Sequence, residues 1–387
     1  MPDFTEPAEF AEIRQAVRQI TEKHGLREYA QRGKASEPQS ELWQELGEAG
    51  FIGINVPEEF GGGGAGMSEL AVVTEASASA GCPLLLILVS SAIAVEILSR
   101  HGSDQQKREW LSRMADGGTK MAFAITEPDA GSNSHQITTT ARQADDGSGD
   151  WIISGQKYYI SGVDESAAIL TVTRTSTDDR GRAAISLFIV PTDAEGLVAT
   201  RLPVAAQIPD RQFTVFYDDV RVPASALIGA AGNGFRPLFQ GLNPERISSA
   251  ALCVGIGRFA LDAAADYARS RNVWGTPIGT HQGVSHPLAQ AKINVELAAL
   301  MLTKAAWLHD HGDDAAEASN MAKAAAADAA VAAVDAAIQA HGGNGLSEEY
   351  GLMPLYGMAR LLRIAPVSKE MVLNYVAQHT LKLPRSY

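Results

Sequence analysis

The positions of apolar residues divide the chain into three zones, of which the first is helical. In residues 4–24 the apolar side chains recur at every third or fourth position, as Phe10, Ile13, Val17 and Ile20. This spacing is typical of one buried face of an α-helix. The segments 38–49 and 67–80 behave similarly, so residues 5–115 are expected to be helical. The glycine run at 61–64 lacks the GK[ST] of a phosphate-binding loop, which favours a plain connection over a phosphate site.

The second zone, from about Met121 to Ile228, is predicted to be a β domain. Its short runs of β-branched and aromatic residues are WIISG, YYISG, AILTVTR, AISLFIVP, LVATRLPV and FTVFYDDV. Turn-forming residues separate the runs, for example at 145–149 and 178–181. Short strands with hairpin-like turns at regular intervals predict an antiparallel β domain of about a hundred residues.

The helical period returns at Gly234 and continues to about His379 in the third zone. Residues 315–339 are rich in alanine, the residue with the highest helix propensity. The order of helical, β and helical zones does not fit a doubly wound nucleotide-binding fold, in which strands and helices alternate. We therefore expect an α+β protein with a helical domain at 1–120, an antiparallel β domain at 121–232 and a second helical domain at 233–387.

Composition narrows the class of protein. Apolar residues make up 45% of the 387 residues, which is enough for a sizeable core. The formal net charge of −13 argues against a general nucleic-acid binder, although local arginines could still hold an anionic ligand. Cys82 and Cys253 lack the spacing of a disulfide framework or a metal site, so we expect no metal and two core cysteines. The N-terminus lacks the pattern of a secretory signal, and the apolar stretch 83–94 is too short to span a membrane. A cytoplasmic protein without a membrane partner is expected.

The first segment with candidate chemistry is MAFAITEPDAGSN at 121–133. A short apolar strand ends there in a polar turn that carries the hydroxyl groups of Thr126 and Ser132. Together with the backbone N–H groups of the turn, these hydroxyls could hold an anionic or carbonyl-rich ligand. The same pattern also occurs in turns that are only structural.

Five motifs, taken in order, resemble those of the acyl-CoA dehydrogenase family. They are AFAITEPDAGS near 122–132, DWIISGQKYYISG at 150–162, FYDDVRVPASALIG at 216–229, ALDAAADYARSRNVWGTPIGTHQ at 260–282 and QAHGGNG at 339–345. The resemblance covers nearly the whole chain. It implies that the C-terminal domain is a four-helix bundle, that the cofactor is FAD and that the protein is a homo-oligomer, either a dimer or a tetramer. It also implies an acyl-CoA substrate and an electron-transfer flavoprotein as the electron acceptor.

The resemblance assigns the cofactor-binding residues to two groups. Residues expected at the flavin ring are Phe123, Ile125, Thr126, Tyr159 and Ser161. The family often has tryptophan and threonine at the last two positions, so an aromatic ring and a hydroxyl group are retained. Residues expected at the remaining parts of FAD are Arg271, Trp274, Gln282, Gln339, Gly342, Gly343 and Ser368. Arg271, Trp274 and Gln282 are expected to meet an FAD molecule that is bound mainly by another subunit.

The position of the catalytic base departs from the commonest family pattern. Many members carry the glutamate in a C-terminal Y-E-G-T motif, but this chain has Pro366 at that position. Isovaleryl-CoA and long-chain acyl-CoA dehydrogenases carry the glutamate on an earlier helix, where this chain has LNPERI at 242–247. The resemblance thus implies Glu245 as the base and Ser132, Leu242 and Arg246 as substrate-binding residues. Without the resemblance, Glu245 would be interpreted as an exposed glutamate in a first helical turn, stabilised by the helix dipole.

Pro366 also removes a backbone N–H group at a position where family members use one to polarise the thioester oxygen. Either the local register differs by one residue, or polarisation depends more on the flavin.

The sequence leaves three functions open. The first is FAD-dependent α,β-dehydrogenation of an acyl-CoA to the trans-2-enoyl-CoA, with a branched, cyclic or longer acyl group preferred. The second is an acyl-CoA oxidase or a β-elimination on the same fold. The third is a non-catalytic acyl-CoA or flavin-binding protein.

Overall fold

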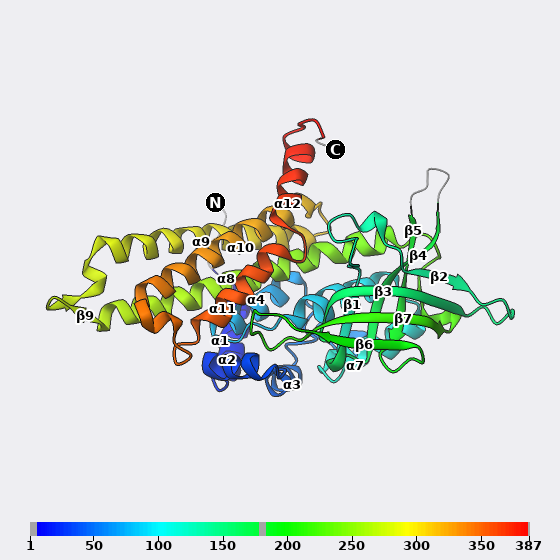
Figure 1. Ribbon diagram of the computed structural model, residues 1–387, viewed down its shortest axis with the longest axis horizontal. Coiled ribbons are helices and arrows are strands. Elements are labelled where there is room, and N and C mark those ends of the chain that lie inside the picture. Colours follow the sequence, from blue (N-terminus) through cyan, green and yellow to red (C-terminus); the bar gives the residue numbers. More distant parts are fainter. Residues whose placement is uncertain (1–5, 178–182, 386–387) are drawn as a thin grey trace.

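The computed structural model describes residues 6–177 and 183–385, so the turn expected at 178–181 lies outside the described residues. The chain forms an elongated molecule with a helical half and a half that contains a β-sheet (Figure 1). The first zone is helical, as predicted. Its elements are α1 (Ala8–Thr21), α2 (Gly25–Ala35), α3 (Ser40–Glu48), α4 (Met67–Ser79), the π-helix η2 (Ile87–Ala94), α5 (Val95–His101), α6 (Asp104–Gln106), the π-helix η3 (Lys107–Leu111) and α7 (Ser112–Ala115). The glycine run at 61–64 is a loop whose backbone N–H groups bond within the protein. Gly63 donates to the carbonyl oxygen of Gly53, and Gly64 donates to that of Val56.

The second zone forms one sheet with strand order β6-β7-β3-β2-β4-β5-β8. The strands are β1 (Met121–Ala124), β2 (Thr140–Gln143), β3 (Trp151–Ser161), β4 (Ala168–Thr177), β5 (Ala183–Pro191), β6 (Leu197–Leu202), β7 (Gln212–Val222) and β8 (Leu227–Ile228). Most neighbours pair antiparallel, as expected, whereas β1 and β2 each pair with β4 in the parallel sense. The N-terminal helices and the sheet meet in a core that includes Leu98, Leu111, Leu170 and Leu187.

The segment 151–161 is one continuous strand, which corrects the expectation of two strands joined by a turn. Gly155 sits inside β3 at a φ of +146°, and a Cβ atom there would lie 2.6 Å from the Cα of Thr139. The irregular pairing with β7 at this glycine absorbs the distortion as a bulge. A second irregularity follows between Lys157 and Ile160. The glycine that predicted a turn, Gly155, therefore marks a bulge within one strand.

The third zone is a bundle of long helices, as predicted. Its elements are α8 (Phe235–Ser270), α9 (Gln282–Asp310), α10 (Ala316–His341), α11 (Leu352–Ile364) and α12 (Lys369–Tyr375), with a short hairpin of β9 (Asn272–Val273) and β10 (Thr276–Pro277) between α8 and α9. Helix α8 is long and apolar enough to cross a membrane, but 78% of its most apolar stretch is buried within the protein, as in the core helix of a bundle. The alanines of α10 give it a narrow surface, which lets α8, α9 and α11 pack closely around it.

The two helical zones share one core. Leu70 and Val73 of α4 belong to the same buried cluster as Ile256 of α8 and Val334 of α10. Cys82 and Cys253 are buried in this cluster as free thiols, as expected, and burial raises the pKa of each to about 12.

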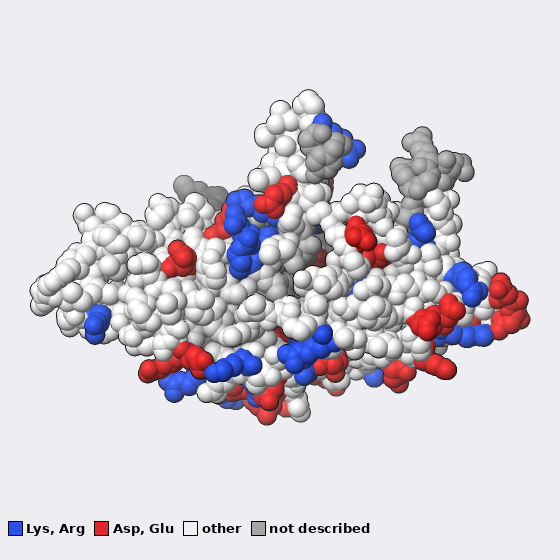
Figure 2. All heavy atoms as spheres, viewed as in Figure 1, with Lys and Arg blue, Asp and Glu red and all other residues white. Residues whose placement is uncertain are grey.

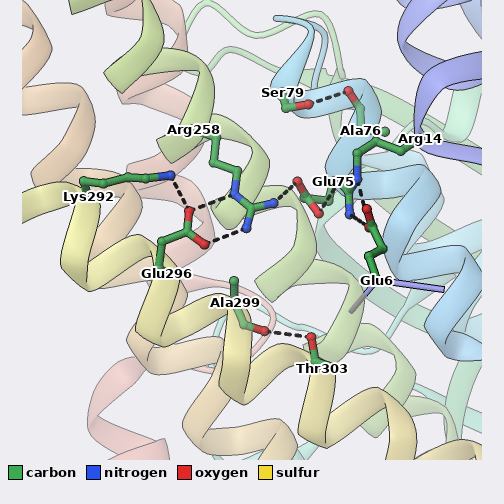
Figure 3. Close-up of polar contacts among 10 residues, drawn as sticks. All are labelled: Glu6, Arg14, Glu75, Ala76, Ser79, Arg258, Lys292, Glu296, Ala299 and Thr303. Carbon is green, nitrogen blue, oxygen red and sulfur yellow. Dashed lines mark hydrogen bonds and ion pairs between the residues drawn. The ribbon is translucent and has the colours of Figure 1, made fainter. Parts of the chain in front are cut away.

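An ionic network also joins the two helical zones (Figure 3). The buried carboxylate of Glu75 on α4 accepts hydrogen bonds from Arg14 of α1 and from Arg258 of α8, each at 2.6 Å. Arg258 also donates to Glu296 of α9 at 2.9 Å, and Lys292 donates to the same carboxylate at 2.6 Å. Glu75 thus joins three helices, and Arg258 extends the network to a fourth, α9.

We expect Glu75→Gln to destabilise the protein by about 3 kcal/mol, because two partly buried guanidinium groups would lose their carboxylate partner. Urea denaturation measures the change in the free energy of unfolding. The matched control is Glu22→Gln, which breaks an exposed pair with Arg18 and should cost less than about 1 kcal/mol. Equal effects of the two substitutions would contradict the importance of the buried network.

Candidate functional site

Glu245 is a buried carboxylate in the interior of α8. The helix begins at Phe235, so Glu245 lies in its third turn and not in an exposed first turn. The helix is buried on nearly all sides in this region, because every residue from Pro244 to Gly257 except Arg246 is buried. The side chain of Glu245 is buried with only 8% of the residue exposed. Burial raises the pKa of Glu245 to about 8, although the positive charges of Arg246 and Lys323 lower it. When it is ionised, a carboxylate with a raised pKa binds a proton more tightly than an ordinary exposed glutamate does.

Arg246 lies next to this carboxylate. Its Nη1 donates to Asn243 at 3.1 Å, while its Nε is buried without a hydrogen-bond partner among residues 6–177 and 183–385. A buried guanidinium N–H without an acceptor suits a ligand that supplies an oxygen atom. Leu242 is half-buried on the same helix, one turn before Arg246, and Ser132 is exposed in the turn after β1. The structure therefore brings Glu245, Arg246 and Leu242 together on α8 and leaves Ser132 on a loop.

Lys323 is a site residue that the sequence reasoning missed. Its fully buried ammonium group comes from α10 and donates to the carbonyl oxygens of Arg363, at 3.3 Å, and of Val367. These two residues flank Pro366. The sequence of α10 could have indicated this burial, because small buried residues recur at every third or fourth position and the lysine lies among them. The buried positions are Ser319, Ala322, Lys323, Ala326, Ala327 and Ala330. A lysine on such a stripe indicates a specific buried role.

The residues expected at the flavin ring lie together at the ends of β1 and β3. Phe123 is buried in β1. Two residues after the end of this strand, the carbonyl oxygen of Thr126 accepts a hydrogen bond of 2.8 Å from the backbone N–H of Tyr158. Tyr159 has a φ of +57° and 53% of the residue exposed, and its ring stands edge-on to that of Tyr158. Ser161 donates to the side-chain oxygen of Gln212 at 3.0 Å. An exposed aromatic ring and a hydroxyl group held by Gln212 thus lie on the segment of β3 that follows the contact with Thr126.

A buried ion pair holds this loop in place. Glu127 accepts hydrogen bonds from the N–H groups of Thr138 and Thr139, at 2.6 and 3.0 Å, and from Lys157 at 2.9 Å. Burial opposes ionisation of Glu127, but Lys157 and the backbone donors together lower its pKa to about 2. Lys157 also donates to the carbonyl oxygen of Ile125 at 3.1 Å. The glutamate of the TEP motif, which the sequence reasoning left without a role, therefore fixes residues 125–127 against β3.

The other predicted cofactor residues, with the exception of Ser368, gather at the far end of the bundle. Arg271 ends α8, Trp274 lies in the β9–β10 hairpin with 89% of the residue exposed, and Gln282 begins α9. Gln339 lies in the last turn of α10, and Gly342 follows with a φ of +61° that favours glycine. The Tyr267 ring stacks on the His341 ring at 4.2 Å, which places the end of α8 beside the end of α10.

These two groups of residues are far apart within one chain. The hairpin with β9 lies at one end of the molecule, whereas β1 and β3 lie in the opposite half (Figure 1). Arg271 lies about 39 Å from Glu245 along α8 at 1.5 Å per residue. Ser368 belongs to neither group, because it caps α12 and accepts a hydrogen bond from the N–H of Met371. The structure therefore brings together the flavin-ring residues, and separately the residues at the bundle end.

The donor groups present fit the two ends of a dinucleotide such as FAD. At the bundle end, Arg271 is exposed and a Cβ atom at Gly342 or Gly343 would meet nothing within 4 Å, so this surface is open to a ligand. An exposed guanidinium group and exposed backbone suit a pyrophosphate, and Trp274 offers an aromatic face. At the β-domain end, Tyr159 and the Thr126 and Ser161 hydroxyl groups suit a flat ring with polar edges.

Comparisons with known proteins identify the family of the chain. Family models match the acyl-CoA dehydrogenase N-terminal domain at residues 7–118, the middle domain at 122–220 and the C-terminal domain at 232–381. The chain is 56% identical to acyl-CoA dehydrogenase FadE12 of Mycobacterium tuberculosis over 386 residues, which is 99% of each chain.

Two solved structures share the fold. A glutaryl-coenzyme A dehydrogenase in complex with glutaryl-CoA is 27% identical with a TM-score of 0.93, covering 100% of this chain and 98% of that one. An FAD complex of PigA is 26% identical with a TM-score of 0.90, covering 99% and 100%. The chain belongs to the acyl-CoA dehydrogenase family of flavoprotein oxidoreductases.

Proposed function

We propose that the protein catalyses FAD-dependent α,β-dehydrogenation of an acyl-CoA thioester to the trans-2-enoyl-CoA, with Glu245 as the base. The observation that carries the proposal is a buried carboxylate on α8 beside Arg246, in a chain that has proline where many family members have their glutamate. A dry environment raises the proton affinity of Glu245, which suits it to remove a weakly acidic proton next to a thioester carbonyl.

In this proposal, different residues bind the flavin, bind the substrate and remove the α-proton. Phe123, Ile125 and Thr126 would contact one side of the flavin ring, with Tyr159 and Ser161 at another. Bound FAD would supply the acceptor for the hydride that leaves the β-carbon. A Glu245 carboxylate oxygen would take the α-proton. Arg246, Leu242 and Ser132 would contact the substrate, and the buried surroundings of α8 would exclude water from the carboxylate.

The two separated groups of cofactor residues support a homo-oligomer with shared FAD sites. Each site would combine the flavin-ring residues of one chain with the adenosine-side residues of another. Exposed apolar residues on one helix support such assembly, because α9 carries Ile293, Leu297, Leu300 and Trp307 with more than half of each residue exposed. The upper part of the bundle, where α9 lies in Figure 1, also shows few charged side chains on the face in Figure 2. An electron-transfer flavoprotein is the proposed electron acceptor.

Glu245→Gln should retain FAD but lose at least about 1,000-fold in the rate at which acyl-CoA bleaches the flavin under anaerobic conditions, because an amide does not accept the α-proton. The measurement is stopped-flow absorbance with a panel of straight, branched and cyclic acyl-CoAs. Glu22→Gln serves as the control, since it changes an exposed glutamate outside the site and should bleach normally. Normal bleaching in Glu245→Gln would rule out this base. Readmitting air after bleaching separates the alternatives, since an oxidase is reoxidised rapidly by O₂ and a β-eliminating enzyme shows no net bleaching.

The bleaching rate of the wild-type protein should rise with pH through about 8, because Glu245 accepts a proton only when it is ionised and its pKa is raised to about 8. Stopped-flow measurements between pH 6 and pH 9.5 test this, at a substrate concentration that saturates the enzyme at each pH. A rate that is flat over this range would contradict the raised pKa.

Mixed oligomers test the shared FAD site. Tyr159→Ala should damage the flavin-ring half of a site, and Arg271→Ala the other half. In an oligomer of one chain of each kind, a shared arrangement leaves one site intact and one doubly damaged, so about half of the flavin content should return. Sites built within one chain would recover none. Arg269→Ala, an exposed arginine of the same helix that pairs with Asp266, is the matched control and should bind flavin normally.

A further inference from the structure

Two hydrogen bonds connect the end of β3 with the start of β7, the strand beside it in the sheet (Figure 1). Ser161, the last residue of β3, donates its hydroxyl proton to Gln212 Oε1 at 3.0 Å. Gln212 Nε2 donates to the carbonyl oxygen of Asp210 at 3.3 Å. Ser161 and Gln212 are directly opposite each other in the antiparallel register. Strand pairing itself therefore places the two side chains on one face of the sheet, within reach of each other.

The amide of Gln212 is held in one orientation. The residue is buried, with 5% exposed, and β7 lies between β3 and β6. The N–H of Gly162 donates to the carbonyl oxygen of Arg211 at 2.9 Å, so the backbone is also bonded next to the pair. An amide oxygen only accepts hydrogen bonds and an amide NH₂ only donates. Reversing the amide would set its oxygen against the carbonyl oxygen of Asp210. This carbonyl therefore determines that Gln212 presents an acceptor to Ser161.

The orientation of Gln212 decides what the Ser161 hydroxyl can do. A serine hydroxyl has one proton and two lone pairs, and here the proton is used in the bond to Gln212. Ser161 is only half-buried, so the rest of its hydroxyl group is accessible to a ligand. No group in residues 6–177 or 183–385 donates a hydrogen bond to its oxygen. Toward a ligand, Ser161 is thus an acceptor and not a donor.

An acceptor beside a flavin ring interacts differently with the two oxidation states of the ring. Ring nitrogens that are bare acceptors in the oxidised form carry hydrogen after a hydride and a proton have been taken up. A hydroxyl oxygen with its proton turned away matches an N–H group and does not match a bare nitrogen. The arrangement of Ser161 and Gln212 is therefore better matched to the reduced form of the ring.

We propose that Gln212 is a positioning residue, which holds the Ser161 hydroxyl as an acceptor toward the flavin ring and thereby raises the reduction potential of bound FAD. Gln212 acts through Ser161 and needs no contact with the cofactor of its own. The proposal rests on the proposed function, in which Ser161 contacts the ring.

Three variants of the FAD-loaded full-length protein test the proposal. Ser161→Ala removes the hydroxyl group, Gln212→Met removes the amide with a side chain of similar length, and a third variant combines both changes. Gln212→Leu replaces Gln212→Met if the latter does not fold. The measurement is the equilibrium reduction potential of the flavin against a reference dye at fixed pH, without acyl-CoA.

The same pair of strands offers a matched control. Ser154 of β3 also donates to a side chain of β7, Asp219, at 2.6 Å. It lies about 23 Å along the strand from Ser161, at about 3.3 Å per residue. Ser154→Ala therefore removes a similar hydrogen bond between the strands outside the site.

Ser161→Ala should lower the equilibrium ratio of reduced to oxidised flavin about tenfold, which for a two-electron couple is about 30 mV. Gln212→Met should lower it at least as far, because the freed hydroxyl proton can turn toward the ring and favour the oxidised form. The double variant should have the potential of Ser161→Ala, since Gln212 has nothing to orient once the hydroxyl group is gone. Ser154→Ala should keep the wild-type potential.

An unchanged potential in Ser161→Ala would overturn the acceptor role of the hydroxyl group. Additive effects in the double variant would show that Gln212 does not act through Ser161, and an equal fall in Ser154→Ala would show a general disturbance of the strand pair. Failure of the proposed function is recognised separately. A wild-type protein that retains FAD but is bleached by no acyl-CoA would contradict that function, while the potentials, measured without substrate, would still test the role of Gln212.

Discussion

The burial of one carboxylate between α8 and α10 is the constraint on which the site depends. Glu245 occupies a position in the third turn of α8 that packing makes inaccessible to water, and its pKa rises accordingly. Burying an isolated carboxylate is costly, so the fold must supply compensating charge. It does so with Arg246 from the same helix and Lys323 from the neighbouring one. The alanine-rich side of α10 permits this close approach, because small side chains let the two helices pack tightly.

The sheet contributes a different kind of rigidity. The Glu127–Lys157 pair and the backbone bond from Tyr158 to Thr126 fix the end of β1 against β3. The part of the proposed cofactor site that lies in the β domain is therefore preformed on strands, while the other proposed part lies on helix ends at the distant tip of the bundle. The ionic network around Glu75 keeps the helical zones in a fixed relation (Figure 3). Such a division suits an enzyme whose complete site requires a second chain.

Much of this architecture could be predicted from the sequence, because apolar periodicity changes twice along the chain and the motifs occur in family order. The family resemblance implied Glu245 as the base, but its burial was not predicted, because α8 is buried on nearly all sides from Pro244 to Gly257 and offers no amphipathic pattern there. The continuity of β3 was missed because Gly155 is a turn signal in sequence and a bulge in the sheet. Lys323 was missed although it lies on the buried side of an alanine-rich helix, because its partners are backbone carbonyl groups some forty residues away, which the local sequence does not identify.

The most direct test of the account is the protonation state of Glu245 itself. Infrared difference spectra of the FAD-loaded protein between pH 6 and pH 9.5 should show the C=O stretch of a buried carboxylic acid that disappears as pH passes about 8. The same band should be missing from Glu245→Gln. A Glu245 signal that titrates near the ordinary glutamate value of about 4.3, and so leaves no protonated band at pH 6, would contradict the central claim.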